Sequence, residues 1–554
     1  MFSNKTLVVL SLTLVLVLLL TACSSSPSPS PSTAAKTAAA SPATSAAITT
    51  APAPPASSIA PAATPPASAT PQYGGILRRH GQVGPSQPIG WPVEGSPTST
   101  DPVNQVCLER LLIEMGDGSI VPWLATGYQV AADKKSVTLT LRQGVKFHDG
   151  SDFNAQAVKF NLDAYITAKS ATAATWSSID VVDNYTVRVN LKQYQNTVVP
   201  GIGGILQVSP AAYQKNGVEG IRWNPVGTGP FKYSSFQRDV SLKFEKNTDY
   251  WQKGKPYLDG INMVYIADFS AALMAFKSGQ LDIFQSESSK MSSDLKNEGY
   301  IYGTQLPQCA GTLTLLPDSA NADSPLANKL VREAVEYGID RETISNGLGY
   351  GFMTPSYQIA PPTAAIAFVP DLPARKYDPA KAKQLLAQAG FPNGIKTKLI
   401  GSPQTTTKDI MVALQSSLAT AGIQGDIEFP QMAQFTDYRY NGWKNGFLCG
   451  LLSNFATYTS YYSFYWQGNQ YNSVKFPEGF SAQVQDVLTT EKMDKDKLQK
   501  LTRMIYDDSS MTPVNVQVVA WFFAKGLHDT GIFTAHHSYW SPSTAWLEKG
   551  APIK

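Results

Sequence analysis

The feature that most limits what this chain can fold into is a long segment near its start, residues 24–72, made almost entirely of Ala, Ser, Thr and Pro. It holds one charged residue, Lys36, and no aromatic residue. Such a segment cannot bury enough apolar surface to offset the entropy lost on ordering, and its prolines favour extended conformations. We therefore predict a disordered tether, with a globular structure only from Tyr73 onward.

The tether is preceded by an apolar run over residues 7–20, behind a single positive charge at Lys5. The run is shorter than the about 18 residues that a membrane-spanning helix needs, and it is typical of a secretory signal. The sequence Leu20-Thr21-Ala22-Cys23 resembles a bacterial lipobox, in which cleavage before the cysteine leaves its thiol to carry a lipid. We expect a lipoprotein signal peptide over 1–22 and a lipidated Cys23 that holds 23–72 on a membrane. An ordinary cleaved signal peptide is the alternative.

Composition limits what the rest of the chain can do. The net charge of the 554 residues is +3 and no basic block occurs, so no nucleic-acid partner is expected. The chain carries 10 Trp and 25 Tyr, which together with its length predicts a sizeable core spread over more than one domain. Beyond the first 20 residues no apolar run is long enough to span a membrane, so the globular part is expected to be soluble.

Periodicity predicts a mixture of strands and helices. Alternating apolar residues predict strands at 136–142, 185–191 and 240–244, and the first two follow turn signals, which favours two similar hairpins. Helical spacing predicts helices at 154–168, 326–339, 378–390 and 408–422. A further helix is expected to begin after Asp340, which would be its N-cap. Because strands and helices are mixed along the chain, the fold class expected is α/β or α+β.

Several longer motifs follow one another between Tyr73 and about residue 530. They are GSIVPWLATGYQV, LTLRQGVKFHDGSDFNAQAVKFNLD, NPVGTGPFKY, FEKNTDYWQKGKPYLDGI, FKSGQLDIF, LVREAVEYGIDRETI and YDPAKAKQLLAQAGFPNG. In this order they resemble the family 5 extracellular solute-binding proteins, the peptide- and nickel-type binding components of ABC importers. The resemblance implies an α/β, two-lobed fold of the periplasmic-binding-protein type II kind with an extra subdomain on the first lobe.

The resemblance also implies where each part of that fold lies in this chain. The first lobe is expected from 73–105, 226–308 and 512–554, with the extra subdomain at 106–225. The second lobe is expected at 309–511. Two crossings between the lobes would act as the hinge, and a ligand in the cleft would favour the closed state through contacts made only there.

An enzyme is the competing class, and the sequence offers it little. The chain has five histidines and carries no H-E-x-x-H, G-x-S-x-G or phosphate-binding loop motif. The adjacent His536 and His537 point to opposite faces if the segment is extended, so a metal site there is not favoured. His148-Asp149 is interpreted as a fixed polar corner. We expect no catalytic residue, no metal and no cofactor.

The ligand class stays open between a peptide and an oligosaccharide. Peptide-binding relatives place an Asp after a tryptophan to pair with the peptide's amino group, but the matching segment 446–468 holds no acidic residue and Asn454-Phe455 stands nearest. The same segment is rich in aromatic rings, which suit stacking on sugars. The loop at 81–95, which carries Trp91, is expected to line the cleft as well. The ligand-binding residues predicted are Trp91, Trp443, Asn454, Phe455, Tyr458 and Trp466.

The function expected is that of a binding lipoprotein that delivers its ligand to the permease subunits of an ABC importer. The chain would act as a monomer on the outer face of the cytoplasmic membrane, in the periplasm if the host has an outer membrane. A lipid-tethered ligand sensor or adaptor on the same scaffold, not coupled to import, is the alternative.

Three cysteines remain after Cys23, namely Cys107, Cys309 and Cys449. An oxidising compartment permits one disulfide among them, and three buried free thiols are the alternative. The resemblance implies a bridge between Cys309 and Cys449, which some peptide-binding relatives carry at similar places. Cys107 would then be a free and buried thiol.

Overall fold

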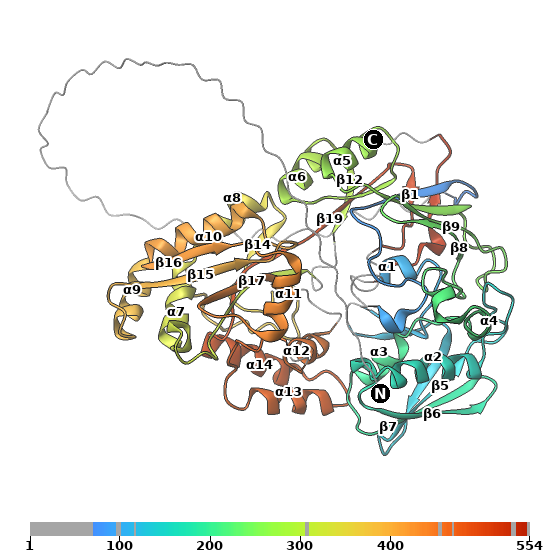
Figure 1. The fold of residues 1–554 in the computed structure, drawn as a ribbon, viewed down its shortest axis with the longest axis horizontal. Helices are drawn as coiled ribbons and strands as arrows, with labels where there is room; N and C mark the ends of the chain where they lie inside the picture. The colour runs from blue at the N-terminus through green and yellow to red at the C-terminus, as the bar shows by residue number, and fades with distance from the viewer. Residues whose placement is uncertain are drawn as a thin grey trace, which may run out of the picture. The chain divides into compact units, whose positions relative to one another are not determined.

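The computed structural model describes most of the chain after the tether. The described residues are 70–95, 101–115, 118–304, 310–452, 457–467, 470–532 and 539–550, and at 101, 102, 466 and 467 only the backbone is described. Helices and strands are mixed throughout this part, so the predicted α/β class is confirmed (Figure 1). Within the described residues, no helix is both long and apolar enough to span a membrane.

The first sheet is built from distant parts of the chain. Its strands are β1 (Ile76–Gly81), β8 (Phe231–Gln237), β9 (Ser241–Lys246), β10 (Gly260–Tyr265), β11 (Ile283–Gln285), β12 (Ile301–Thr304) and β19 (Ala520–Phe523). They form a seven-stranded sheet in the order β12-β19-β11-β1-β10-β9-β8. β1 runs parallel to β10 and β11, so the carboxyl ends of these three strands lie at one edge of the sheet.

The second sheet has six strands in the order β14-β18-β13-β17-β15-β16. Their bounds are β13 (Gly311–Pro317), β14 (Met353–Pro355), β15 (Ile395–Gly401), β16 (Ile423–Glu428), β17 (Gly446–Leu452) and β18 (Thr512–Gln517). β15 is parallel to β16 and β17, whereas β13 is antiparallel to β17 and β18. All seven residues of β13 are buried, as expected for a central strand covered on both faces.

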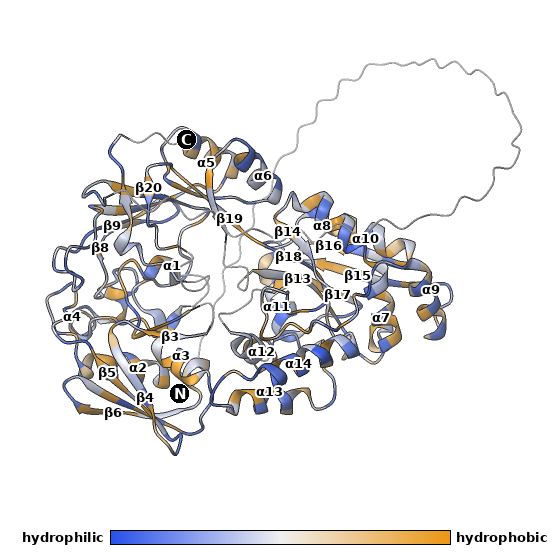
Figure 2. Ribbon diagram, turned by 180° about the vertical axis from the view of Figure 1, so that it is seen from behind, coloured by the Kyte–Doolittle hydropathy of each residue, from blue (hydrophilic) through white to orange (hydrophobic). Residues whose placement is uncertain are grey.

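Alternate residues of each strand point to opposite faces of the second sheet. Helices cover both of these faces. Leu315 and Cys449 pack on one side, against α7 (Lys329–Gly338), α8 (Arg341–Gly349), α9 (Pro379–Gln388) and α10 (Lys408–Thr420). Leu316 and Leu448 pack on the other side, against α11 (Met432–Asn441), α12 (Tyr458–Gln467), α13 (Phe480–Thr489) and α14 (Lys495–Asp508). In Figure 2 the hydrophobic colour appears on strands such as β15 and also on helices such as α2 and α13.

A third sheet, with four strands, is formed by residues that lie between β1 and β8 in the sequence. Its order is β4-β5-β7-β6, with bounds β4 (Ala125–Val130), β5 (Ser136–Leu141), β6 (Trp176–Asp183) and β7 (Thr186–Leu191). Helix α2 (Ala155–Thr167) packs on it and shares its hydrophobic core. The remaining elements here are α1 (Asp101–Asn104), β2 (Leu112–Glu114), β3 (Ile120–Pro122), α3 (Val198–Gly203) and α4 (Pro210–Ile221).

Local signals in the sequence located these elements well. The strands predicted at 136–142 and 185–191 are β5 and β7, and the helix predicted at 154–168 is α2. Asp340 caps α8 as predicted, since its side chain accepts a hydrogen bond from the backbone N–H of Thr343 at 3.0 Å. The fixed polar corner is also confirmed: the His148 ring bonds to the Gly229 carbonyl at 2.9 Å.

The chain passes between the first and second sheets twice. One passage, 305–309, lies outside the described residues, and the other joins β18 to β19 at 517–520. Helices α5 (Phe269–Lys277) and α6 (Ser289–Asn297) flank this region. An apolar cluster that includes Phe276, Phe352 and Val518 packs at the second passage.

One predicted boundary is corrected here. The sequence predicted that the chain returns to the first lobe at residue 512. β18 instead pairs with β13 and β14 of the second sheet, so the return begins only with β19. β18 and β19 are successive buried strands with the same apolar pattern, and they differ only in the strands with which they pair.

Candidate functional site

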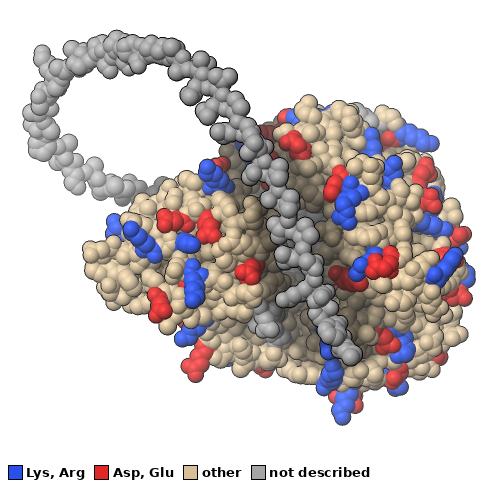
Figure 3. All heavy atoms as spheres, viewed as in Figure 1, with Lys and Arg blue, Asp and Glu red and all other residues tan. Residues whose placement is uncertain are grey.

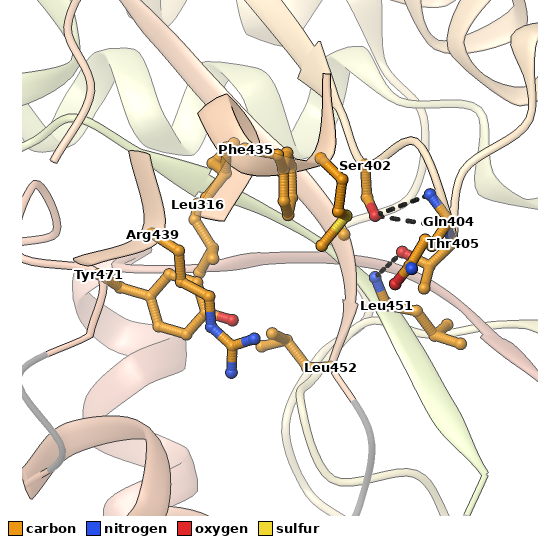
Figure 4. A pocket seen from close by; sticks show the side chains of 12 residues that line it. Leu316, Ser402, Gln404, Thr405, Phe435, Arg439, Leu451, Leu452 and Tyr471 are labelled. Carbon is orange, nitrogen blue, oxygen red and sulfur yellow. Dashed lines mark hydrogen bonds between the residues drawn. The ribbon is translucent and has the colours of Figure 1, made fainter. Parts of the chain in front are cut away.

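A pocket opens at the edge of the second sheet where the parallel strands β15 and β17 end (Figure 4). Ser402, Gln404 and Thr405 follow β15, and Gly450 to Leu452 form the end of β17. In open α/β sheets ligands bind outside the carboxyl ends of the strands, which is where this pocket lies. Its free volume is about 100 Å³.

The polar rim of the pocket is a tightly bonded turn. The Ser402 hydroxyl accepts hydrogen bonds from the backbone N–H groups of Gln404 and Thr405 at 3.4 and 3.3 Å. The hydroxyl of Thr405 accepts one from the N–H of Leu451 at 3.2 Å, which ties the turn to β17. Because its backbone is held in this way, the turn gives the pocket a fixed polar wall.

Arg439 on α11 supplies the cation of the pocket. Its Nε donates to the Gln470 side-chain oxygen at 2.6 Å, and its guanidinium carbon lies 5.4 Å from the centre of the Tyr471 ring. No carboxylate among the described residues forms an ion pair with it. The outer nitrogens of the guanidinium therefore remain available to an anionic group, for which arginine provides a planar set of donors.

Trp443 stands behind this pocket and does not line it. Its side chain is only 3% exposed, its ring N–H donates to the Gly446 carbonyl at 3.0 Å, and its ring meets Tyr471 edge to face. Tyr471 does line the pocket. The prediction that Trp443 contacts ligand is therefore corrected: its ring fixes the position of Tyr471.

The other predicted ligand contacts divide into core residues and residues outside the described part. Trp91 is 8% exposed and packs on Phe160 and Tyr213 beside the first sheet, and Tyr458 is 3% exposed in the core under α12. These two rings pack in the core because large aromatic side chains bury the most apolar area. The predictions for Asn454, Phe455 and the side chain of Trp466 lie outside the described residues.

Sequence reasoning missed Arg439 and the turn that starts at Ser402. The turn follows a strand and is rich in Ser, Thr, Gln and Pro, which is a signal of a polar loop at the end of a strand. Arg439 lies in the helix sequence Asp437-Tyr438-Arg439-Tyr440, where nothing distinguishes it from a surface residue. Only the packing of α11 next to β17 brings it to the pocket.

The predicted disulfide between Cys309 and Cys449 is not supported. Cys449 is a free, buried thiol, and its burial raises its pKa far above the usual range. It lies in β17 opposite Leu315 of β13. Cys309 itself lies outside the described residues. Cys107 is free and buried, as predicted.

A polar contact joins the third-sheet region to the helices under the second sheet. The backbone N–H of Asn196 donates to the Leu488 carbonyl at 2.8 Å, and its side-chain amide donates to Val487 at 2.9 Å and Thr490 at 3.1 Å. Asn196 follows β7, and its partners lie at the end of α13. These bonds hold the two regions together far from the chain passages in sequence.

Other charged groups do not suggest a second kind of site. On the face in Figure 3, Lys and Arg are interspersed with Asp and Glu, without a patch of one sign. Among the described residues, no cluster of His, Cys, Asp and Glu has the composition of a metal site. His536 and His537 lie outside this part of the chain.

Comparison with known proteins places the chain in a family. The sequence model of the bacterial extracellular solute-binding proteins, family 5, middle region, matches residues 119–473. The glutathione-binding protein GsiB of Salmonella typhi is 32% identical over 315 residues, which is 55% of this chain and 60% of that protein. The chain thus spans about 60% of the length of the curated relatives it matches.

Solved structures share the fold. The periplasmic binding protein DppA of Helicobacter pylori, in complex with the peptide STSA, aligns with a TM-score of 0.71 and 22% identity over 86% of this chain and 99% of that chain. NikA of Brucella suis, in complex with Fe(III)-EDTA, aligns with a TM-score of 0.73 and 20% identity over 86% of this chain and all of that chain.

This protein is a two-lobed α/β binding protein with an extra subdomain. The chain belongs to the bacterial extracellular solute-binding proteins, family 5, which confirms the resemblance seen in the sequence. From here on, the first lobe is the part built on the first sheet, the second lobe is the part built on the second sheet, and the extra subdomain is the part built on the third sheet.

Proposed function

We propose that this chain is the solute-binding component of an ABC importer, and that it captures a peptide-like ligand bearing a carboxylate between its two lobes. Membership in family 5 supports the transport role. The names of relatives and neighbours, a glutathione-binding protein and a binding protein crystallised with a peptide, support the peptide-like class. Glutathione is itself a tripeptide derivative with two carboxylates.

The observation that carries the proposal is Arg439 in the second-lobe pocket. It is a cation without a carboxylate partner among the described residues, at the edge of the sheet where ligands bind. A ligand carboxylate would supply the missing acceptor, and hydrogen bonds to charged groups are worth about 1.5–3 kcal/mol each.

The size of the pocket fits one end of a ligand. Its free volume of about 100 Å³ is smaller than the roughly 300–1,000 Å³ of sites that enclose a whole small molecule. The pocket therefore receives a single terminus or side chain, and the rest of the ligand lies between the lobes. The two passages at 305–309 and 517–520 are the proposed hinge.

An oligosaccharide is the second candidate, and the burial of the aromatic segment weighs against it. Tyr461 and Tyr462 are at most 1% exposed, and Tyr465 is 5% exposed. A ring buried on both faces cannot stack on a sugar. Phe464, at 38% exposed, is the described ring of α12 that retains a free surface.

The lipid anchor is a separate part of the proposal. The lipobox-like Leu20-Thr21-Ala22-Cys23 supports a mature chain that begins at an acylated Cys23 and is tethered by 24–72 to the outer face of the cytoplasmic membrane. The same anchor would serve a sensor or adaptor equally well. Uptake of a labelled ligand by cells with and without the partner permease separates import from sensing.

Calorimetric titration of the full chain tests the ligand class, with glutathione and the tripeptide Ala-Ala-Ala as peptide probes and maltotriose as the neutral probe. We expect at least one peptide to bind, and Arg439→Met to lower its affinity about 10- to 100-fold through loss of the charged hydrogen bonds. The matched control is Arg503→Met on α14, whose guanidinium pairs with Asp371 at 2.8 Å on the surface. Binding of maltotriose alone, or equal affinity in the Arg439→Met variant, contradicts the proposal.

A further inference from the structure

Arg79 is a buried cation in the first lobe whose Nε and Nη1 find no hydrogen-bond partner among the described residues. It lies in β1 between Met263 of β10 and Ile283 of β11, and its side chain is 8% exposed. Both of these nitrogen atoms are buried. An unpaired buried charge is among the most unfavourable features of a protein interior, so this one calls for a physical reason.

The neighbour of Arg79 in the strand shows what a compensated arginine looks like. Arg78 points to the opposite face of β1, where its guanidinium bonds to both carboxylate oxygens of Asp282, at 2.6 and 3.0 Å, and to the Gly279 carbonyl. The side-chain contacts of Arg79 with described residues are with aromatic rings. Its guanidinium carbon lies 4.8 Å from the centre of the Trp521 ring and 4.3 Å from that of Trp540. Such contacts hold a cation in place but accept none of its hydrogen bonds.

Two further polar groups on the first-lobe side are buried and form no hydrogen bond with any described residue. The Tyr265 hydroxyl has no hydrogen-bond partner, and this residue interacts electrostatically with Arg79. The side-chain amide of Asn104, 1% exposed, is unpaired at both its nitrogen and its oxygen. Gln105, next in the chain, accepts a hydrogen bond from the backbone N–H of Trp540 at 3.3 Å, which links this segment to the ring beside Arg79.

Tyr265 and Trp521 lie at the carboxyl edge of the parallel strands of the first sheet. Tyr265 ends β10 and pairs with Gly81, the last residue of β1, so it marks the carboxyl edge of the parallel strands. Trp521 pairs with Gln285, the last residue of β11, and follows the passage at 517–520 directly. Arg79 reaches from mid-strand between these two side chains. The site therefore lies at the edge that corresponds to the pocket edge of the second sheet.

We propose that Arg79 is the anion-binding residue of the first lobe, and that it receives a carboxylate of the ligand beside Trp521 and Trp540. This inference rests on the proposed function, because the ligand is the one that the second lobe holds at Arg439. A ligand with two carboxylates would bridge Arg79 and Arg439, which gives it contacts that exist only when the lobes are closed.

The surroundings of Arg79 favour a carboxylate among anions. The guanidinium fork matches a planar carboxylate, and the Trp521 and Trp540 rings, 4.8 and 4.3 Å from the guanidinium carbon, hold the fork in place. The Tyr265 hydroxyl, on a residue that interacts electrostatically with Arg79, is an additional neutral donor. A phosphate shares the negative charge but is tetrahedral, so the test includes inorganic phosphate.

Thermal unfolding of the full chain tests the site with simple anions. Sodium acetate and sodium phosphate are titrated against sodium chloride at constant ionic strength. We expect acetate to raise the Tm of the unmodified chain saturably and to leave that of Arg79→Met unchanged. Without added anion, Arg79→Met should itself have the higher Tm, because it removes an uncompensated charge. The matched control, Arg78→Met, should lower the Tm yet keep the acetate response. Arg79→Lys keeps the charge and loses the fork, so its response should be weaker.

The outcomes separate this site from the proposed function. No acetate response in the unmodified chain, or an equal response in Arg79→Met, overturns the site, and a response to phosphate alone overturns its assignment to a carboxylate. Glutathione titrated into the same variants tests the ligand: Arg79→Met should lower its affinity about 10- to 100-fold. An Arg79-dependent acetate response without binding of any peptide probe leaves the site standing and refutes the proposed ligand class. Full glutathione affinity in Arg79→Met refutes the site alone.

Discussion

Two buried charged residues, one in each part of the molecule, have different kinds of partner. In the second lobe, Arg341 is fully buried and pairs with the carboxylate of Glu336, and its Nε donates to the Pro513 carbonyl at 2.7 Å. On the first-lobe side, Glu109 is 4% exposed and forms no ion pair with a described residue. It accepts hydrogen bonds from neutral donors only, which are Trp123, Thr228, Tyr250 and Trp251, at 2.7–2.9 Å.

This difference indicates what each region can respond to. A buried ion pair that is closed within the chain, such as Arg341–Glu336, fixes packing and has no use for an external partner. A buried group without an opposite charge responds to protons or to a ligand. Glu109 and Arg79 are both of this second kind, and both belong to the side of the molecule that carries the extra subdomain.

The largest effect is expected from breaking the second-lobe pair. Arg341→Met leaves the Glu336 carboxylate buried without its cation, so the variant should lose about 3–5 kcal/mol of stability. Chemical denaturation of the full chain, followed by circular dichroism, measures the loss.

Two controls sharpen this result. Arg503→Met breaks an exposed pair and should cost about 1 kcal/mol or less. The double variant Arg341→Met with Glu336→Leu removes both charges and should recover most of the lost stability. If the single variant is as stable as the unmodified chain, the pair does not fix the second-lobe core.

The buried carboxyl group of Glu109 should make the stability of the chain depend on pH. Burial raises its pKa from an ordinary value of 4.5 to about 7, although four donors favour the carboxylate. Because the folded state binds the proton more tightly than the unfolded state, the stabilisation is complete below about pH 4.5 and is lost as the pH rises through about 7. The shift corresponds to about 3 kcal/mol.

Glu109→Gln should therefore flatten the fall in stability between pH 4.5 and 7, measured as the Tm of the full chain at each pH. Some slope should remain, since burial also raises the pKa of Glu114 to about 7. The same pH profile in the variant and in the unmodified chain would show that Glu109 does not titrate in this range.

Local signals in the sequence predicted the elements but not their assembly. β5, β7 and α2 were found because alternation and N-caps are local properties. The boundary at 512 was misplaced because β18 and β19 are consecutive buried strands that join different sheets. Strand pairing is long-range and leaves no mark in a single sequence.

The candidate site was harder to predict for the same reason. An aromatic ring marks a core or a ligand surface equally well in sequence, and Trp91, Trp443 and Tyr458 turned out to be core residues. The useful cations are single arginines, Arg439 and Arg79, in segments without a motif. What distinguishes them is that neither pairs with a carboxylate of the described residues, and only the packing of distant elements reveals that.

The contact between the subdomain and the second lobe links the two regions directly. Asn196→Ala removes the two side-chain hydrogen bonds to Val487 and Thr490, worth about 1 kcal/mol each. If these bonds hold the lobes closed, the affinity for a bound peptide should fall about 5- to 30-fold while the Tm changes little. Calorimetry measures the first and thermal unfolding the second. The control is Asn190→Ala, whose amide bonds to Ser178 and Asp180 within the subdomain. Unchanged affinity would mean that the contact does not influence closure.

The smallest effect, no change in Tm on reduction, is expected for Cys449. This experiment tests whether a disulfide links the second lobe to the passage between the lobes. A disulfide closing a loop of more than a hundred residues would stabilise the chain by about 4–5 kcal/mol, and reduction would remove that. Because Cys449 is a buried free thiol beside the Leu315 position of β13, a reductant should leave the Tm of the full chain unchanged. Under denaturing, non-reducing conditions Cys449 should be alkylated directly, as should Cys107, which serves as the internal control for a free thiol. If peptide mapping shows that Cys449 is alkylated only after reduction, the predicted disulfide to Cys309 is present. The second lobe would then be stabilised by a covalent link as well as by its packing.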